Sequence, residues 1–137
     1  MDPITFFLKE LNVPKQYRGK TEVYLIKDKM IYVAKTKWGF HTIPGGGIEP
    51  EETPEQCAHR ECIEEIGVKI KDLKKMEANP FCFSFEGNSQ FMGIYAGMCI
   101  FTFYAKPVSI SGKGIEKHLK LDIISIDEMI ESCRKAL

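Results

Sequence analysis

Three glutamates lie within a five-residue stretch of the chain, at Glu61, Glu64 and Glu65. In an α-helix, residues spaced i, i+3 and i+4 share one face, so these carboxylates would lie side by side. Like charges at this spacing destabilise a helix, and Arg60 is the only base in the surrounding segment, residues 46–68. One arginine cannot pair with three carboxylates, whereas a divalent cation can bind them together. An all-oxygen ligand set favours Mg²⁺, for which Mn²⁺ could substitute.

A solvent-exposed acidic helix face is the ordinary explanation for a run of glutamates, so the surrounding pattern has to decide. A helix over Pro54–Ile66 is strongly predicted. Thr53 is a typical N-cap, the proline suits the first helical position, and Gln56 completes a capping box. Gly67 then provides a C-terminal stop.

One side of this helix is expected to be apolar, because Cys62, Ile63 and Ile66 would lie opposite the glutamates and pack on a sheet. Just before the helix, Pro44 and the three glycines at 45–47 require a turn in conformations that only glycine adopts cheaply. The glutamates are therefore expected beside a glycine loop.

The rest of the chain is expected to form mostly strands. β-Branched and aromatic residues predict a hairpin over 21–26 and 30–35, and further strands over 68–76, 80–86, 91–106 and 121–124. Helices are predicted at 3–11 and from the N-cap Ser125 to about Ala136. Strands of mixed spacing with helices at intervals predict an α+β fold, a mixed α/β sandwich, and the lack of repeats and linkers favours a single domain over residues 1–137.

The composition excludes several classes of protein. The chain has 137 residues, is 44% hydrophobic and carries 19 basic and 19 acidic residues, which argues against disorder and against a cationic coat for nucleic acid. The zero net charge hides an asymmetry, because the segment 46–68 holds seven acids and one base while the remainder is basic. The apolar stretch 91–105 is shorter than the roughly 20 residues of a spanning helix, so no membrane partner is expected.

Targeting and cysteine patterns favour a cytoplasmic protein. The N-terminal residues lack the basic start and long apolar core of a signal peptide and are interpreted as mature sequence. The five cysteines form no C-x-x-C pair, and no zinc-ligand spacing is present. Reduced, mostly buried thiols are therefore expected.

The glycine loop and helix together resemble the complete signature of the Nudix hydrolase family. From Gly46, five residues lead to Glu52 and seven more to Arg60-Glu61-Cys62-Ile63-Glu64-Glu65-Ile66-Gly67-Val68. Every fixed position is filled, and the one mild departure is the cysteine, where the family more often has a larger aliphatic residue. Competing motifs fail, because the loop has neither the ending of a P-loop nor the third glycine of a dinucleotide fingerprint.

This resemblance implies the Nudix fold, a central mixed sheet on which the catalytic loop-helix and a C-terminal helix pack. It also implies a hydrolase of phosphoric anhydride bonds that cuts within the pyrophosphate of a nucleoside diphosphate linked to another group. Glu61, Glu64, Glu65 and the backbone carbonyl of Gly45 would bind the metal ion, and Glu61 or Glu64 would be the general base. The divalent ion would neutralise the pyrophosphate oxygens and activate a water.

Two further features of the site follow from the resemblance. Glu52 and Arg60 would pair across the loop-helix junction and hold the catalytic helix in register. A carboxylate from a later loop often completes the site in MutT-like members. Glu116 is the candidate here, with an ordinary surface glutamate as the alternative interpretation, and Glu86 is a weaker second choice.

Substrate contacts are the least specified part of the site. Bases are often gripped by aromatic stacking and a few polar groups, and an alternating aromatic run at 81–85 would face one side of a strand, where core packing is the ordinary explanation. The candidate substrate-binding residues are Trp38, Phe40, Phe83 and Asn88.

The intact signature in a short chain favours a MutT-like enzyme that converts a nucleoside triphosphate, an oxidised one included, to a nucleoside monophosphate and pyrophosphate. Dinucleoside polyphosphates and the 5′ end of an RNA are alternatives, the latter because lysines cluster at 69, 71, 74 and 75. Other nucleic-acid partners are not expected. A Nudix-fold sensor that binds a nucleotide without cleaving it is a further alternative, although such modules commonly lose signature carboxylates. Base specificity and oligomeric state stay open.

Overall fold

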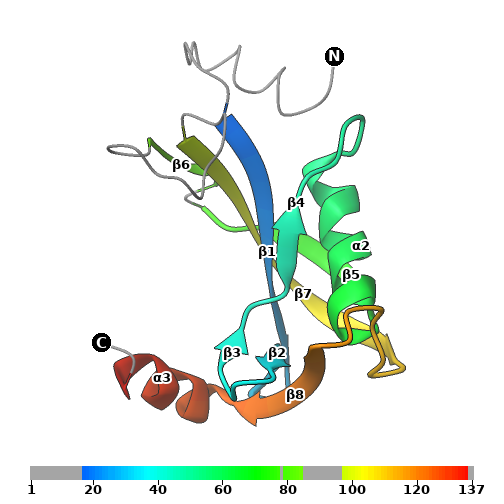
Figure 1. The fold of residues 1–137 in the computed structure, drawn as a ribbon, viewed down its shortest axis with the longest axis vertical. Helices are drawn as coiled ribbons and strands as arrows, with labels where there is room; N and C mark the ends of the chain where they lie inside the picture. The colour runs from blue at the N-terminus through cyan, green and yellow to red at the C-terminus, as the bar shows by residue number, and fades with distance from the viewer. Residues whose placement is uncertain (1–16, 78, 85–96, 136–137) are drawn as a thin grey trace.

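One mixed sheet of eight strands organises the residues described by the computed structural model, which are 17–77, 79–84 and 97–135 (Figure 1). The strands are β1 Tyr17–Lys27, β2 Met30–Thr36, β3 His41–Thr42, β4 Gly45–Gly47, β5 Val68–Lys75, β6 Phe81–Ser84, β7 Gly97–Ile110 and β8 Leu119–Ser125. The described helices are α2 Pro54–Ile66 and α3 Ile126–Lys135.

The sheet is mixed because its two central strands run parallel while the others pair antiparallel. The strand order is β3-β2-β1-β7-β5, and β4 pairs with β1, β6 with β7 and β8 with β2. In the parallel pair, Tyr17 to Leu25 of β1 lies beside Gly97 to Ala105 of β7. Helix α2 lies along one side of this sheet and α3 lies beside β8 at the lower end of the molecule (Figure 1). The predicted α+β architecture is confirmed.

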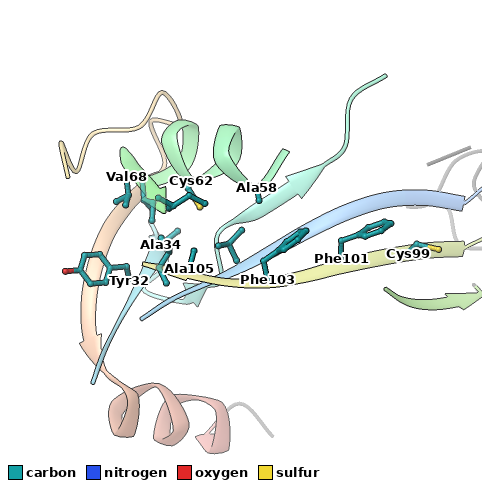
Figure 2. Packing of buried hydrophobic residues seen from close by; sticks show 13 residues of the cluster. Tyr32, Ala34, Ala58, Cys62, Val68, Cys99, Phe101, Phe103 and Ala105 are labelled. Atoms are coloured by element: carbon teal, nitrogen blue, oxygen red, sulfur yellow. The ribbon is translucent and has the colours of Figure 1, made fainter. Parts of the chain in front are cut away.

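The main hydrophobic core lies between α2 and the sheet. Alternate residues of β7, including Phe101 and Phe103, are buried, which is the pattern expected for a strand with one covered face. Figure 2 shows Ala58 and Cys62 of α2 above this row of β7 side chains. A smaller cluster on β2 and β8 packs against Met129 of α3.

The predicted ends of α2 are confirmed in detail. The Thr53 hydroxyl accepts a hydrogen bond from the Gln56 backbone N–H at 3.1 Å, and the Thr53 backbone N–H donates to the Gln56 side-chain oxygen at 2.9 Å. Gly67 ends the helix in the left-handed conformation, with a φ of 66°. Both caps depend on residues adjacent in sequence, which is why they could be predicted.

The buried side of α2 differs from the prediction. Ile63 is 46% exposed and does not pack on the sheet, whereas Glu61 and Glu65 are only 9% and 8% exposed. The buried residues of α2 lie on one side of the helix, between the directions of Cys57 and Ile66. At 100° per residue, Glu61 and Glu65 point to this side, whereas Ile63 points away from it. Two carboxyl groups therefore occupy positions that would otherwise belong to the core.

The other predicted elements are met where the structure describes them. The β1–β2 hairpin turns at Asp28 and Lys29, both with positive φ, and the strands predicted over 68–76 and 121–124 correspond to β5 and β8. Helix α3 starts as expected, because the Glu128 N–H donates to the Ser125 hydroxyl at 3.0 Å. The helix predicted at 3–11 and parts of the strands predicted over 80–86 and 91–106 lie outside the described residues.

The expectation that all five cysteines are reduced is wrong for one pair. Cys82 and Cys99 form a disulfide, because the antiparallel register of β6 and β7 places them directly opposite each other. That register cannot be read from sequence spacing. Cys57 and Cys62 are free and buried, as expected, and Cys133 is free and exposed. The disulfide removes one of the two arguments for a cytoplasmic location.

Within the described ranges, neither helix has the length and apolar character needed to cross a membrane.

Removing the N-cap of α2 is expected to destabilise the whole domain. Thr53→Ala deletes the hydroxyl that accepts the Gln56 N–H, and we expect a loss of about 1 kcal/mol in the free energy of unfolding. Urea denaturation followed by circular dichroism measures this. Thr53→Ser keeps the acceptor and should stay near the wild type, so equal losses in the two variants would contradict the capping role.

Candidate functional site

The glycine loop lies close against both β1 and α2. Its residues form β4, which pairs antiparallel with Lys20 to Glu22 of β1. A Cβ atom at Gly45 would collide with the backbone carbonyl of Thr21, and one at Gly46 would collide with the carboxyl group of Glu61. Only glycine allows this approach, so the loop brings backbone directly against a glutamate of the helix.

Glu61 and Glu65 form a buried carboxyl pair beneath this loop. Glu65 Oε1 accepts a hydrogen bond from the Gly45 N–H at 3.2 Å, and the two carboxyl groups also hydrogen-bond each other. Burial raises the pKa of Glu61 and raises the pKa of Glu65 to about 8. Desolvation disfavours the charged forms, so the pair calls for a nearby cation to stabilise them.

The Arg60 side chain donates hydrogen bonds both to the glycine loop and Glu52 and to side chains of its own helix. Its Nε and Nη2 atoms donate to the two carboxylate oxygens of Glu52 at 2.7 and 3.0 Å, and Nη2 also donates to the Gly47 carbonyl at 3.0 Å. Its Nη1 atom donates to Glu61 at 2.9 Å and to Glu64 at 3.0 Å. The guanidinium lowers the pKa of Glu52. The structure thus brings Glu52 and Arg60 together, as the family resemblance implied.

The chemistry of this donor set fits a divalent cation. Glu61 and Glu65 lie against the glycine loop and Glu64 shares Arg60 with Glu61, and oxygen ligands are those that Mg²⁺ and Mn²⁺ prefer. Among the described residues, no three acidic, histidine or cysteine side chains converge closely enough to hold a metal ion as they stand. Arg60 Nη1 donates to both Glu61 and Glu64, so the guanidinium offsets part of their charge.

Glu116 belongs to the loop between β7 and β8, which lies against the C-terminal end of α2. The backbone N–H groups of Ile115 and Glu116 donate to the Glu64 carbonyl at 2.7 and 3.3 Å, which docks this loop on α2. The Glu116 charge contributes to the raised pKa of Glu65. Its own carboxylate is 3.6 Å from His118 Nε2. The predicted fourth carboxylate is therefore near the cluster. Glu86, the second choice, lies outside the described residues.

Three of the predicted substrate contacts lie within the described residues, and all three are exposed. Trp38 and Phe40 lie in the turn between β2 and β3 and are 71% and 68% exposed, with Lys37 Nζ 4.6 Å from the tryptophan ring centre. Phe83 is exposed rather than in the core, and strand alternation turns it away from the α2 side, which Cys99 faces. Asn88 lies outside the described residues.

Two residues near the loop were missed by the sequence reasoning. Cys57 lies under the loop, with Sγ 3.3 Å from the Thr21 hydroxyl and 3.5 Å from the Gly47 carbonyl, and burial raises its pKa to about 12. The Arg18 guanidinium lies against Gly47. Cys57 could have been suspected, because it precedes Arg60 by almost one helical turn. Arg18 carries no such signal, since only the β1–β4 pairing brings it to the loop.

A side chain at Gly46 is expected to collide with Glu61 and so disturb the buried carboxyl pair. In Gly46→Ala the added methyl group meets the Glu61 carboxyl, which is buried, so we expect the free energy of unfolding to fall by about 1 to 3 kcal/mol, as measured by urea denaturation. Gly47→Ala is the matched control, because its methyl group meets the far end of the exposed Arg18 side chain. Unchanged stability in Gly46→Ala would contradict this close approach.

This chain is similar to known proteins both in sequence and in fold. The model of the NUDIX domain family matches residues 11–115. The NAD-capped RNA hydrolase NudC of Pasteurella multocida is 38% identical over 61 residues, which cover 44% of this chain and 23% of that protein. The protein of the same name from Mannheimia succiniciproducens is 35% identical over 79 residues, which cover 58% of this chain and 28% of that one. The chain thus matches about a quarter of the length of these relatives.

Solved structures show the same fold. A NUDIX hydrolase from Nitrosomonas europaea superposes with a TM-score of 0.67 at 18% identity, covering 87% of this chain and 79% of the other. The MutT protein from Bacillus halodurans superposes with a TM-score of 0.65 at 23% identity, covering 83% of this chain and 72% of the other.

Proposed function

Because the chain belongs to the Nudix family, we propose that it is a divalent-metal-dependent pyrophosphohydrolase that cleaves a nucleoside diphosphate linked to another group. One observation carries the proposal. Arg60 makes two hydrogen bonds to Glu52 and so ties the loop before α2 to the helix, in which Glu61 and Glu65 are buried against Gly46 and Gly45. A solvent-exposed acidic helix face would need neither the hydrogen bonds between Arg60 and Glu52 nor the burial of two of its glutamates.

In this proposal the burial and the contacts of each residue determine its role. Glu61, Glu64 and Glu65, with the Gly45 carbonyl and Glu116, would hold Mg²⁺ or Mn²⁺, which when bound neutralises pyrophosphate oxygens and acidifies a water. Glu64 is the better candidate for general base than Glu61, because its side chain is 31% exposed and can reach a water, whereas Glu61 is buried. Glu52 and Arg60 are positioning residues.

We propose a nucleoside triphosphate, an oxidised one included, as the first substrate class, with a nucleoside monophosphate and pyrophosphate as products. The second candidate is the 5′ end of an RNA, since the relatives from Pasteurella multocida and Mannheimia succiniciproducens are named NAD-capped RNA hydrolases. Their matched segments cover less than a third of each relative, so their substrate reaches this chain only as a proposal.

A substrate panel with product identification tests the proposal. Nucleoside triphosphates, 8-oxo analogues, dinucleoside polyphosphates, NAD, triphosphorylated RNA and NAD-capped RNA are each incubated with Mg²⁺ or with EDTA, and the products are separated by anion-exchange chromatography. We expect metal-dependent cleavage within a pyrophosphate, and the identity of the product shows which bond breaks. Tight nucleotide binding without turnover in either metal would support the sensor alternative instead.

A further inference from the structure

A second charged feature lies at the opposite end of β1 from the glycine loop. A hollow of about 350 Å³ opens there, lined by Ile26, Lys27, Asp28, Lys71, Lys106 and Pro107. These residues come from the β1–β2 turn, the first half of β5 and the last part of β7, which meet at this end of the sheet (Figure 1). Three lysines and one aspartate leave the lining with a net positive charge.

The pairing of strands forces two of these lysines together. Lys71 of β5 lies directly opposite Lys106 of β7 in the antiparallel register. Like charges at such cross-strand positions destabilise a sheet. Within the part of the chain that the structure describes, neither of them nor Lys27 makes an ion pair. Asp28 is the one acidic residue of the lining, so the hollow keeps a net positive charge.

Protection of a sheet edge accounts for only part of this arrangement. β5 is an edge strand, and lysines on an edge discourage pairing with another chain, which explains Lys69, Lys71 and Lys74. Lys106 is different, because it lies on β7 rather than on the edge strand and pairs with β5, one residue beyond the last pair of β7 with β1, Leu25 and Ala105. Two exposed lysines directly opposite each other at the wall of a hollow need another explanation.

The hollow is separate from the carboxyl cluster. Thr21 of β1 pairs with Gly46 of the glycine loop, and Lys27 lies six residues further along the same strand. At about 3.3 Å per residue, this separation along the strand is about 20 Å. A ligand group in the hollow would therefore not touch Glu61, Glu64 or Glu65.

We propose that the hollow is a phosphate-binding site, in which Lys27, Lys71 and Lys106 surround one anionic phosphate group. Lysine ammonium groups bind phosphate as point charges, and three of them around one small hollow suit a multivalent oxyanion better than a carboxylate. The phosphate can come from a small compound such as pyrophosphate or from the backbone of an RNA strand. The proposal holds whichever nucleotide the carboxyl cluster accepts.

Binding measured without divalent metal tests this site apart from catalysis. The wild-type protein in EDTA is titrated with inorganic pyrophosphate in one arm and with a short single-stranded RNA in the other, with fluorescence or calorimetry as the readout. We expect Lys106→Gln and Lys71→Gln each to weaken binding by about tenfold. Lys69→Gln and Lys74→Gln are the matched controls, because they remove the same charge from β5 outside the hollow.

The outcomes separate the sources of phosphate and expose a wrong proposal. Pyrophosphate binding that depends on Lys106 indicates a small ligand, while RNA binding alone, weakened by added salt, indicates a backbone phosphate. Equal losses in the hollow and control variants would overturn the site, since they would report only diffuse charge. The absence of saturable binding in both arms would overturn it as well. None of these results depends on hydrolysis, so they distinguish a failure of the phosphate site from a failure of the proposed enzyme activity.

Discussion

Glu64→Gln is expected to lower kcat on the preferred nucleotide by about a thousandfold, with little change in folding stability. Glutamine keeps the size of the side chain but can neither accept a proton nor offer a charged ligand to Mg²⁺, and a positioned base alone contributes factors of this order. The wild-type side chain is 31% exposed, so the neutral amide meets solvent and leaves no buried charge unpaired. Release of phosphate, coupled to an added pyrophosphatase, measures the rate.

A matched variant on the same helix controls for the loss of one negative charge. Glu55 lies in the first turn of α2, has a side chain that is 44% exposed and makes one ion pair with Lys75 at 3.6 Å. Such pairs contribute little, so Glu55→Gln should retain activity within about twofold of the wild type. If Glu64→Gln retained full activity in Mg²⁺ while folded, the assignment of this carboxylate to the site would be wrong.

Local features of this chain could be predicted from the sequence, because short-range contacts create them. The caps of α2 depend on Thr53, Gln56 and Gly67, which are all within one turn of the helix ends. The β1–β2 hairpin likewise depends on a short turn between two strands. The hydrogen bonds between Arg60 and Glu52 could be predicted only from the family pattern. A separation of eight residues between a loop and a helix does not by itself indicate a contact.

Features that depend on register or on the angle of α2 escaped prediction. Cys82 meets Cys99 because β6 happens to pair with β7 in that register, and no local signal specifies it. Ile63 was expected in the core because apolar residues usually are, yet the helix turns Glu61 inward instead. The sequence breaks the hydrophobic pattern at the glutamates, and such local violations are expected where a site overrides packing.

The lysine hollow shows a third limit. The cluster of lysines on β5 was noticed in the sequence, but Lys27 and Lys106 belong to segments far apart in the chain. Only the parallel pairing of β1 with β7 and the antiparallel pairing of β7 with β5 bring them to one end of the sheet. A charge count along the chain cannot therefore separate a surface rich in lysine from a site.

Arg60→Gln is expected to lower the free energy of unfolding by about 3 kcal/mol and to reduce turnover as well. The substitution removes the guanidinium from three carboxylates, at Glu52, Glu61 and Glu64, and leaves partly or fully buried charges without their partner. Urea denaturation measures the stability. Arg134→Gln on α3 is the control, because its exposed pair with Glu131 at 3.9 Å should change stability by no more than about 0.5 kcal/mol.

A double-mutant cycle separates the interaction of Arg60 with Glu52 from the other contacts of Arg60. Glu52→Gln and Glu52→Gln/Arg60→Gln complete the cycle, and we expect a coupling energy of about 1 to 3 kcal/mol, so the double variant should lose less than the two single losses together. Because Arg60 lowers the pKa of Glu52, this contribution is complete above the ordinary glutamate pKa of about 4.3 and is lost as the pH falls through the lowered value. Coupling near zero at pH 7 would show that the two hydrogen bonds between Glu52 and Arg60 do not hold α2 on the glycine loop. The position of the catalytic helix would then have to depend on the buried side of α2 alone.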